Sequence, residues 1–232
     1  MQASADQGCP ASPRTAPFKL SHLQTAISGS PQAIIVALGS SSSEGVAASD
    51  PAHAYPAELQ TMLNAGLPRS HIAVLNRGVG GQDAPEEFAR LDADVLAVRP
   101  QLVIWQVGAN GAMRNADPSE FKRLVTEGVR RMQARGIDVI LMDNQRAPRI
   151  QASAEHGVME AALAEVAQET GVSLFSRAAL MDQWNKEGSP YLQFVASDGL
   201  HHNDRGYFCV ARSLADNILT GLRQNRPVTA SR

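Results

Sequence analysis

The sequence has few cysteines, almost no net charge and no long apolar run. Two cysteines in 232 residues allow one disulfide and are too few for a cysteine-built zinc site. The formal net charge is −2, so the chain as a whole does not attract nucleic acid or an anionic membrane. No apolar stretch approaches the roughly 20 residues that span a bilayer. Together these shortages argue against zinc-finger, nucleic-acid-binding and membrane-spanning proteins.

The first 17 residues lack both the basic start and the apolar core of a signal peptide. They are rich in alanine, serine and proline, and we expect an arm there, outside a single domain that runs from residue 18 to residue 232. Such an arm suits the mature start of an exported protein, and it equally suits the terminus of a cytoplasmic one. Hydrophobic residues make up 44% of the chain and charged residues 19%, as in an ordinary globular domain.

Five short apolar segments, most of them rich in β-branched residues, indicate buried parallel strands at 33–38, 71–76, 102–107, 138–143 and 172–175. Between them, amphipathic patterns predict helices, among them helices capped by Asp83 and Asp117 and helices near 154–170, 177–187 and 204–222. This alternation predicts a three-layer α/β/α sandwich with a parallel, flavodoxin-like sheet of about five strands. Ligands bind at the carboxyl ends of the strands in such sheets, so the loops there are the place to look for a site.

A run of four serines follows the first predicted strand, between Gly39 and Glu44. A serine held between a strand and a helix can expose its hydroxyl near converging backbone N–H groups, which suits a nucleophile that generates an oxyanion. A flexible loop or a helix cap would explain the run equally well. The Gly-x-Ser-x-Gly elbow of the common α/β-hydrolases is missing, so the serines alone leave their role open.

The loops after the second and third strands carry further candidates. Gly78, Gly80 and Gly81 allow positive φ and close approach of the backbone to a ligand, although their spacing fits neither a dinucleotide fingerprint nor a P-loop. Asn110 can donate its amide hydrogen to a developing oxyanion, but Asn-Gly is also a common turn. Both loops therefore admit a structural and a functional explanation.

Near the C-terminus, Asp198 precedes His201 by three residues in a glycine-containing turn. The carboxylate can reach the imidazole Nδ1 and fix the tautomer that presents Nε2 to a nucleophile. A polar loop before a helix cap at Asn203 or Asp204 is the plainer alternative. A metal site that combined these residues with His202 is disfavoured, because adjacent histidines rarely point the same way, and we expect no metal.

The order of these residues resembles that of the SGNH (GDSL-type) hydrolase superfamily, over positions 33 to about 222. In that family a serine follows the first strand, a glycine the second and an asparagine the third, and Asp-x-x-His precedes the last helix. The resemblance implies that Ser41 is the nucleophile and that Asp198 and His201 complete a catalytic triad. It implies no metal or organic cofactor.

The same resemblance implies an oxyanion hole made of the backbone N–H groups of Ser41 and Gly81 and the side chain of Asn110. Two positions depart from the family pattern, because Ser40 and Gly111 stand where aspartates are common. Neither position makes or breaks a bond, so the implied chemistry is unchanged. The Gly-Ser-Ser-Ser form is similar to that of exported bacterial relatives, which favours a periplasmic or secreted location over a cytoplasmic one.

The implied function is hydrolysis of carboxylic esters through an acyl-enzyme on Ser41. The substrate would be a small-molecule or carbohydrate ester, and the lack of a long apolar helix favours a small acyl group, such as an O-acetyl group on carbohydrate. An acyltransferase or a thioesterase could use the same site. A non-catalytic flavodoxin-like module that binds a phosphate or a flavin is the alternative from another class, but it gives Asp198 and His201 no role.

The two cysteines are predicted to form a disulfide. On the helix at 204–222, Cys209 points away from the apolar stripe and falls on the polar face beside Arg212 and Ser213, where a lone thiol is unusual. Cys9 lies in an arm with few apolar residues to anchor it. Pairing Cys9 with Cys209 would pin this arm across the helix. Two free thiols in a cytoplasmic protein are the alternative.

Overall fold

The computed structural model describes residues 8–13, 15–30 and 32–224, so residues 1–7 and 14 of the expected arm lie outside the described residues. Within these ranges, five parallel strands form one sheet in the order β2-β1-β3-β4-β5. The strands are β1 (Gln32–Gly39), β2 (His71–Gly78), β3 (Leu102–Gln106), β4 (Asp138–Met142) and β5 (Ser173–Phe175). The predicted parallel, flavodoxin-like sheet is confirmed.

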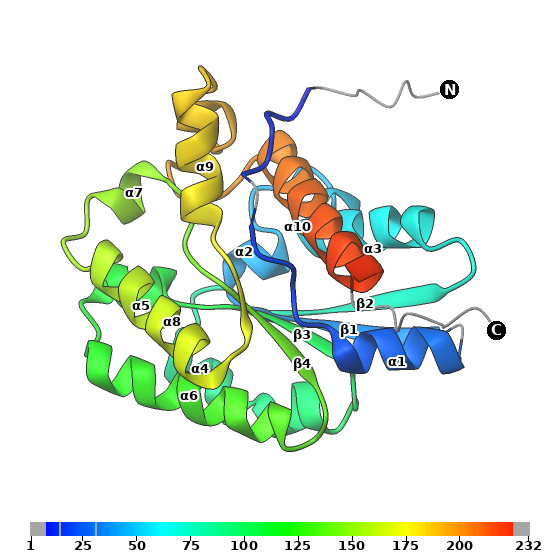
Figure 1. Cartoon of the computed structure of the whole chain (residues 1–232). Coiled ribbons are helices and arrows are strands. Elements are labelled where there is room, and N and C mark those ends of the chain that lie inside the picture. Colours follow the sequence, from blue (N-terminus) through cyan, green and yellow to red (C-terminus); the bar gives the residue numbers. More distant parts are fainter. Residues whose placement is uncertain (1–7, 14, 31, 225–232) are drawn as a thin grey trace.

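Helices cover both faces of the sheet, with α3 and α10 on one face and α4, α6 and α8 on the other (Figure 1). None of the described helices is both long and apolar enough to cross a membrane. The helices are α1 (Ser21–Gly29), α2 (Ser41–Glu44), α3 (Tyr55–Gly66), α4 (Ala84–Ala89), α5 (Ala109–Arg114), α6 (Pro118–Gln133), α7 (Pro148–Gln151), α8 (His156–Thr170), α9 (Arg177–Lys186) and α10 (Asp204–Gln224). Short helical turns lie at η1 (Pro51–His53), η2 (Asp92–Leu96) and η3 (Tyr191–Gln193).

The strands are buried on both faces because alternate side chains enter two separate cores. In β1, Ile35 and Ala37 pack in the cluster that includes residues of α3 and α10. Val36 and Leu38 pack in the other cluster, with residues of α6 and α8. This explains why the strand segments are apolar throughout instead of alternating with polar residues.

The predicted helix starts at Asp83 and Asp117 are confirmed. Asp83 and Glu86 form a reciprocal capping box on α4, and the Asp117 carboxylate caps α6. Helix α1, by contrast, is not expected from the sequence. The backbone N–H of Leu23 in its first turn donates to the carboxylate of Asp138 at 2.9 Å, and the two residues lie 115 positions apart. A cap supplied from so far along the chain leaves no local signal.

A disulfide between Cys9 and Cys209 holds the arm against α10, with 5.5 Å between the two Cα atoms. A hydrogen bond from Thr15 Oγ1 to Asn217 Oδ1 (2.5 Å) holds the arm about two turns further along α10. The prediction that Cys209 lies on a polar face of the helix is wrong in one respect. Cys209 is only 1% exposed and Ser213 only 2%, because the arm covers this face of the helix.

We expect Cys9→Ser to lower the free energy of unfolding by up to about 5 kcal/mol, the chain-entropy figure for a loop of this length. The bridged residues lie 200 positions apart, so the disulfide restricts the unfolded chain strongly. Urea unfolding of the oxidised variant and of the oxidised wild type measures the difference. Wild type treated with a reductant is the matched control and should unfold like the variant. Equal midpoints for all three samples would contradict this expectation.

A second stability effect comes from Glu87 on α4, which is 1% exposed and accepts a hydrogen bond from Trp105 Nε1 at 2.7 Å. Burial raises the pKa of Glu87 to about 8, although the Trp105 hydrogen bond opposes the rise. The ordinary pKa of glutamate is about 4.3. Between these values the folded chain therefore holds a proton on Glu87 that the unfolded chain has lost.

Stability should accordingly fall as the pH rises from about 5 to about 8, and Glu87→Gln should remove this dependence. The amide keeps an acceptor for Trp105 and cannot ionise. One proton corresponds to a difference in slope of about 1.4 kcal/mol per pH unit between wild type and variant. Denaturant unfolding at four pH values in this window measures both slopes, and parallel lines would show that Glu87 does not titrate in this way.

Candidate active site

Ser41 is the first residue of α2, one residue beyond the buried Ser40 at the end of β1. The chain turns here through Gly39, where a Cβ atom would lie 2.5 Å from Ser43 Oγ and 2.8 Å from the carbonyl oxygen of Gln106. Only glycine fits such a close approach. The turn places the partly exposed Ser41 at the carboxyl edge of the sheet.

Three predicted site residues form a hydrogen-bonded chain. His201 Nε2 lies 2.8 Å from Ser41 Oγ, although the two residues are 160 positions apart. On the other side of the ring, Nδ1 lies 2.5 Å from Asp198 Oδ2. An Nδ1–H that donates to the carboxylate leaves Nε2 free to accept the hydrogen of the Ser41 hydroxyl. The arrangement can take a proton from the serine during attack on a carbonyl.

Asp198 is fixed and kept ionised by its surroundings. Its Oδ1 accepts hydrogen bonds from the backbone N–H groups of Leu200 (2.9 Å) and His201 (3.0 Å). Burial acts to raise the pKa of Asp198, but the hydrogen bonds from the His201 ring and these two N–H groups outweigh burial and hold the pKa below its ordinary value. The carboxylate is therefore charged when it faces the imidazole.

The segment after β4 holds the turn that contains Asp198 and His201 in place. Gln145 Nε2 donates to the carbonyl oxygen of Leu200 at 2.8 Å, and the backbone N–H of Arg149 donates to the carbonyl oxygen of Gly199 at 3.0 Å. Gly199 has a φ of +67°, a conformation that favours glycine. These contacts set the position of the turn that brings Asp198 and His201 together.

The glycine loop after β2 lies against Ser41. A Cβ atom at Gly80 would lie 3.9 Å from Ser41 Cβ, and Gly81 has a φ of +78°. The carbonyl oxygen of Gly81 accepts a hydrogen bond from Arg114 Nη2 at 2.7 Å. The loop is therefore close to Ser41 and is hydrogen-bonded to α5 through Arg114.

Asn110 lies in the first turn of α5, not in the turn that an Asn-Gly pair would suggest. Its Nδ2 donates to the carbonyl oxygen of Gln82 at 2.7 Å, so the amide is oriented by the glycine loop. The amide nitrogen carries a second hydrogen for a substrate oxygen. The predicted oxyanion residues thus lie on two segments that are bonded to one another.

Both departures from the family pattern have a structural counterpart. The backbone N–H and the hydroxyl of Ser40 each lie 3.2 Å from Gln106 Oε1, so a side chain from β3 supports the turn before Ser41. A Cβ atom at Gly111 would lie 3.0 Å from both carboxylate oxygens of Asp83. A side chain at 111 would therefore require this buried carboxylate to shift by a few tenths of an ångström. The sequence did not identify Gln106, because it is a single glutamine at the end of an apolar strand and belongs to no motif.

The side chain of His202, the residue next to His201, is completely buried. Its Nδ1 donates to the carbonyl oxygen of Phe194 at 3.0 Å, and its ring packs edge-to-face on Tyr207. Burial and, to a smaller extent, the nearby Arg177 cation lower the pKa of His202 to about 3. The two adjacent histidines therefore face different partners, and only His201 reaches Ser41.

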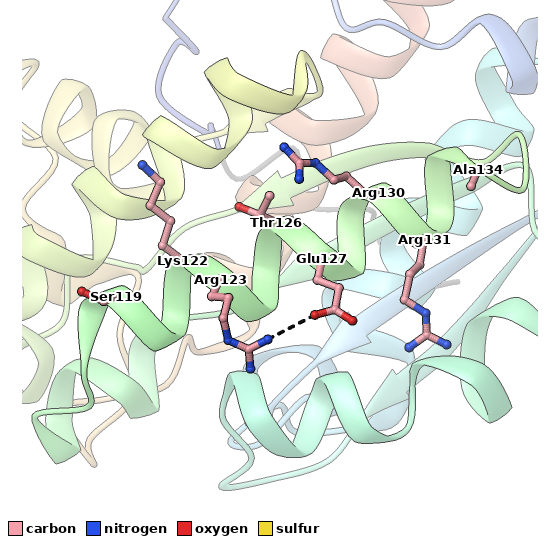
Figure 2. Close-up of a pocket in the computed structure, with 8 residues that line it drawn as sticks. All are labelled: Ser119, Lys122, Arg123, Thr126, Glu127, Arg130, Arg131 and Ala134. Atoms are coloured by element: carbon pink, nitrogen blue, oxygen red, sulfur yellow. Dashed lines mark hydrogen bonds and ion pairs between the residues drawn. The ribbon is translucent and has the colours of Figure 1, made fainter.

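A shallow hollow of about 650 Å³ lies over the outer face of α6, and none of the site residues lines it (Figure 2). Four of its five charged side chains form ion pairs. Arg123 lies 3.2 Å from Glu127, and Lys122 lies 2.8 Å from Glu165 of α8. Such pairing is typical of a solvated helix surface.

Comparisons with known proteins agree with the fold. No curated protein sequence matches this chain. A lipolytic protein assigned to the G-D-S-L family from Desulfitobacterium hafniense shares 22% identity, with a TM-score of 0.67 over 80% of this chain and 99% of that one. The acetylxylan esterase Axe2 of Geobacillus stearothermophilus shares 18% identity, with a TM-score of 0.69 over 86% of this chain and 97% of that one.

A two-domain esterase active on acetylated mannans, co-crystallised with mannopentaose, shares 20% identity, with a TM-score of 0.76. The match covers 93% of this chain but only 57% of the two-domain protein. A family model described as the Non-GDSL lipase-like family matches residues 8–224, and its description suits a chain with Ser40 where a Gly-Asp-Ser motif has aspartate. The chain belongs to the Non-GDSL lipase-like family.

Proposed function

We propose that this protein hydrolyses carboxylic esters through an acyl-enzyme on Ser41. The observation that carries the proposal is the chain of hydrogen bonds from Asp198 through His201 to Ser41, at 2.5 and 2.8 Å. A serine, an imidazole and a carboxylate in this order form the general arrangement for acyl transfer.

In the first half of the reaction, His201 Nε2 takes the hydroxyl proton of Ser41 as Oγ attacks the ester carbonyl carbon. The tetrahedral oxyanion accepts hydrogen bonds from the backbone N–H groups of Ser41 and Gly81 and from the Asn110 amide. The intermediate then collapses, the bond to the alcohol oxygen breaks, and His201 gives its proton to the leaving alcohol. In the second half, water repeats the attack on the acyl-enzyme and the carboxylic acid leaves.

The substrates we propose are esters with small acyl groups, including O-acetyl groups on carbohydrate. Structural neighbours that act on acetylated mannans and on xylan support this class. We also propose a periplasmic or secreted location and a single hydrolase domain over residues 18–232. The Cys9–Cys209 disulfide supports the location, since disulfides persist in oxidising compartments.

Turnover of p-nitrophenyl acetate, followed by acetate release from acetylated xylan and acetylated mannan, tests this function. We expect hydrolysis of the small ester and of at least one polysaccharide. Acetyl transfer to added sugar, at the expense of free acetate, would assign the site to an acyltransferase. Absence of turnover with every ester and thioester would favour a non-catalytic binding module and refute the proposal.

A further inference from the structure

Arg90 lies directly after α4 and has a side chain that is only 15% exposed. Its Nε donates to Gln82 Oε1 at 2.6 Å, and its Nη2 donates to the carbonyl oxygen of Gly39 at 2.9 Å. Its Nη1 pairs with Asp94 Oδ2 at 2.6 Å. One planar guanidinium therefore joins the end of β1, the loop after β2 and the turn η2.

Two of these three partners adjoin the proposed oxyanion hole. Gly39 stands two residues before Ser41 at the end of β1, and Gln82 directly follows Gly81. The carbonyl oxygen of Gln82 also accepts the hydrogen bond from Asn110 Nδ2 at 2.7 Å. Each proposed oxyanion donor thus lies on, or is bonded to, a segment that Arg90 holds.

We propose that Arg90 is a positioning residue that sets the geometry of the oxyanion hole. This inference rests on the proposed function, because it concerns the donors of that reaction. Arg90 acts through its hydrogen bonds to Gly39 and Gln82. Asp94 fixes the guanidinium on the side away from these two acceptors.

Arginine suits this task because its donors are held in one rigid plane and can serve three acceptors in fixed directions. A lysine ammonium carries the same charge but has a single nitrogen, so it cannot bridge Gly39, Gln82 and Asp94 in the same geometry. Oxyanion donors stabilise the transition state only when they are already in place, and a displacement of about 1 Å can cost on the order of a hundredfold in rate.

The test is a double-mutant cycle of Arg90→Lys and Asn110→Ala, measured as kcat and KM for p-nitrophenyl acetate. We expect Arg90→Lys to lower kcat tenfold to a hundredfold, with KM within about twofold. In the Asn110→Ala background the same change should lower kcat by a smaller factor, because one of the three donors that Arg90 positions is gone. Arg131→Lys is the matched control. Arg131 pairs with Asp92 and lies over the ring of Phe88, and Arg131→Lys should leave kcat unchanged.

If Arg90→Lys lowered kcat by the same factor in wild type and in Asn110→Ala, or did not lower kcat at all, the positioning role would be overturned. Where Arg90→Lys does not fold, by circular dichroism, Gln82→Ala replaces it in the cycle, because it removes the loop contact and leaves the Asp94 pair. The same loss of kcat is then expected. An inactive wild type, or a Ser41→Ala variant as active as wild type, would refute the proposed function. The positioning role of Arg90 would then be refuted as well, because it rests on that function.

Discussion

Ser41→Ala is expected to lower kcat for ester hydrolysis by at least about a thousandfold and to leave the fold intact. The reason is chemical, because the lost oxygen is the atom that would form the acyl bond. The Ser41 side chain is partly exposed and its hydroxyl contacts His201 Nε2, which is also partly exposed. Its removal therefore leaves no fully buried polar group without a hydrogen bond. Steady-state kinetics with p-nitrophenyl acetate, alongside circular dichroism of both proteins, measures the effect.

Ser42→Ala is the matched control for this substitution. Ser42 is the next residue of α2 but is 2% exposed, so its hydroxyl is not available to a substrate. We expect its kcat to remain within a few-fold of wild type. An active Ser41→Ala together with an inactive Ser42→Ala would move the nucleophile to the neighbouring serine.

His201→Ala is expected to be the second most damaging substitution, with a loss of at least about a thousandfold in kcat. Without the imidazole the Ser41 hydroxyl has no base, and the Asp198 carboxylate has lost its partner. The acidic limb of the pH–rate profile, which reports protonation of the base, should vanish with it.

The adjacent histidine gives the sharpest comparison. His202→Asn retains a donor for the carbonyl oxygen of Phe194 and removes the titrating ring. Because the pKa of His202 is lowered to about 3 by burial, the wild-type protein keeps this ring neutral throughout the acidic limb. The limb should therefore be unchanged in His202→Asn. Loss of the limb in this variant, with its survival in His201→Ala, would reverse the two roles.

Features with a local physical cause could be predicted from the sequence. The strands are short apolar runs because both faces of the sheet are buried, and the caps at Asp83 and Asp117 are set by residues within one helical turn. Ser41 and Asn110 follow the ends of β1 and β3, which a parallel sheet brings to one edge. The Asp198–His201 pair precedes α10 and follows no strand directly, so the family resemblance and the Asp-x-x-His spacing indicated it, and the structure joins His201 to Ser41.

Features that depend on distant parts of the chain could not be predicted. Strand β2 continues through Arg77 and Gly78, beyond its apolar residues, because both pair with the end of β1. The buried state of Cys209 depends on the arm that covers it, and that of His202 on the packing of Phe194 and Tyr207. Arg90 is a single arginine in an amphipathic segment, and only its folded contacts distinguish it.

The measurement that tests the central claim most directly is the intact mass of the protein after treatment with a serine-directed phosphonate, followed by peptide mapping. We expect one adduct per chain, located on Ser41, and no adduct in His201→Ala under the same conditions. Protein that stays unmodified while a control esterase reacts, or an adduct located on any other residue, would contradict an acyl-enzyme on Ser41.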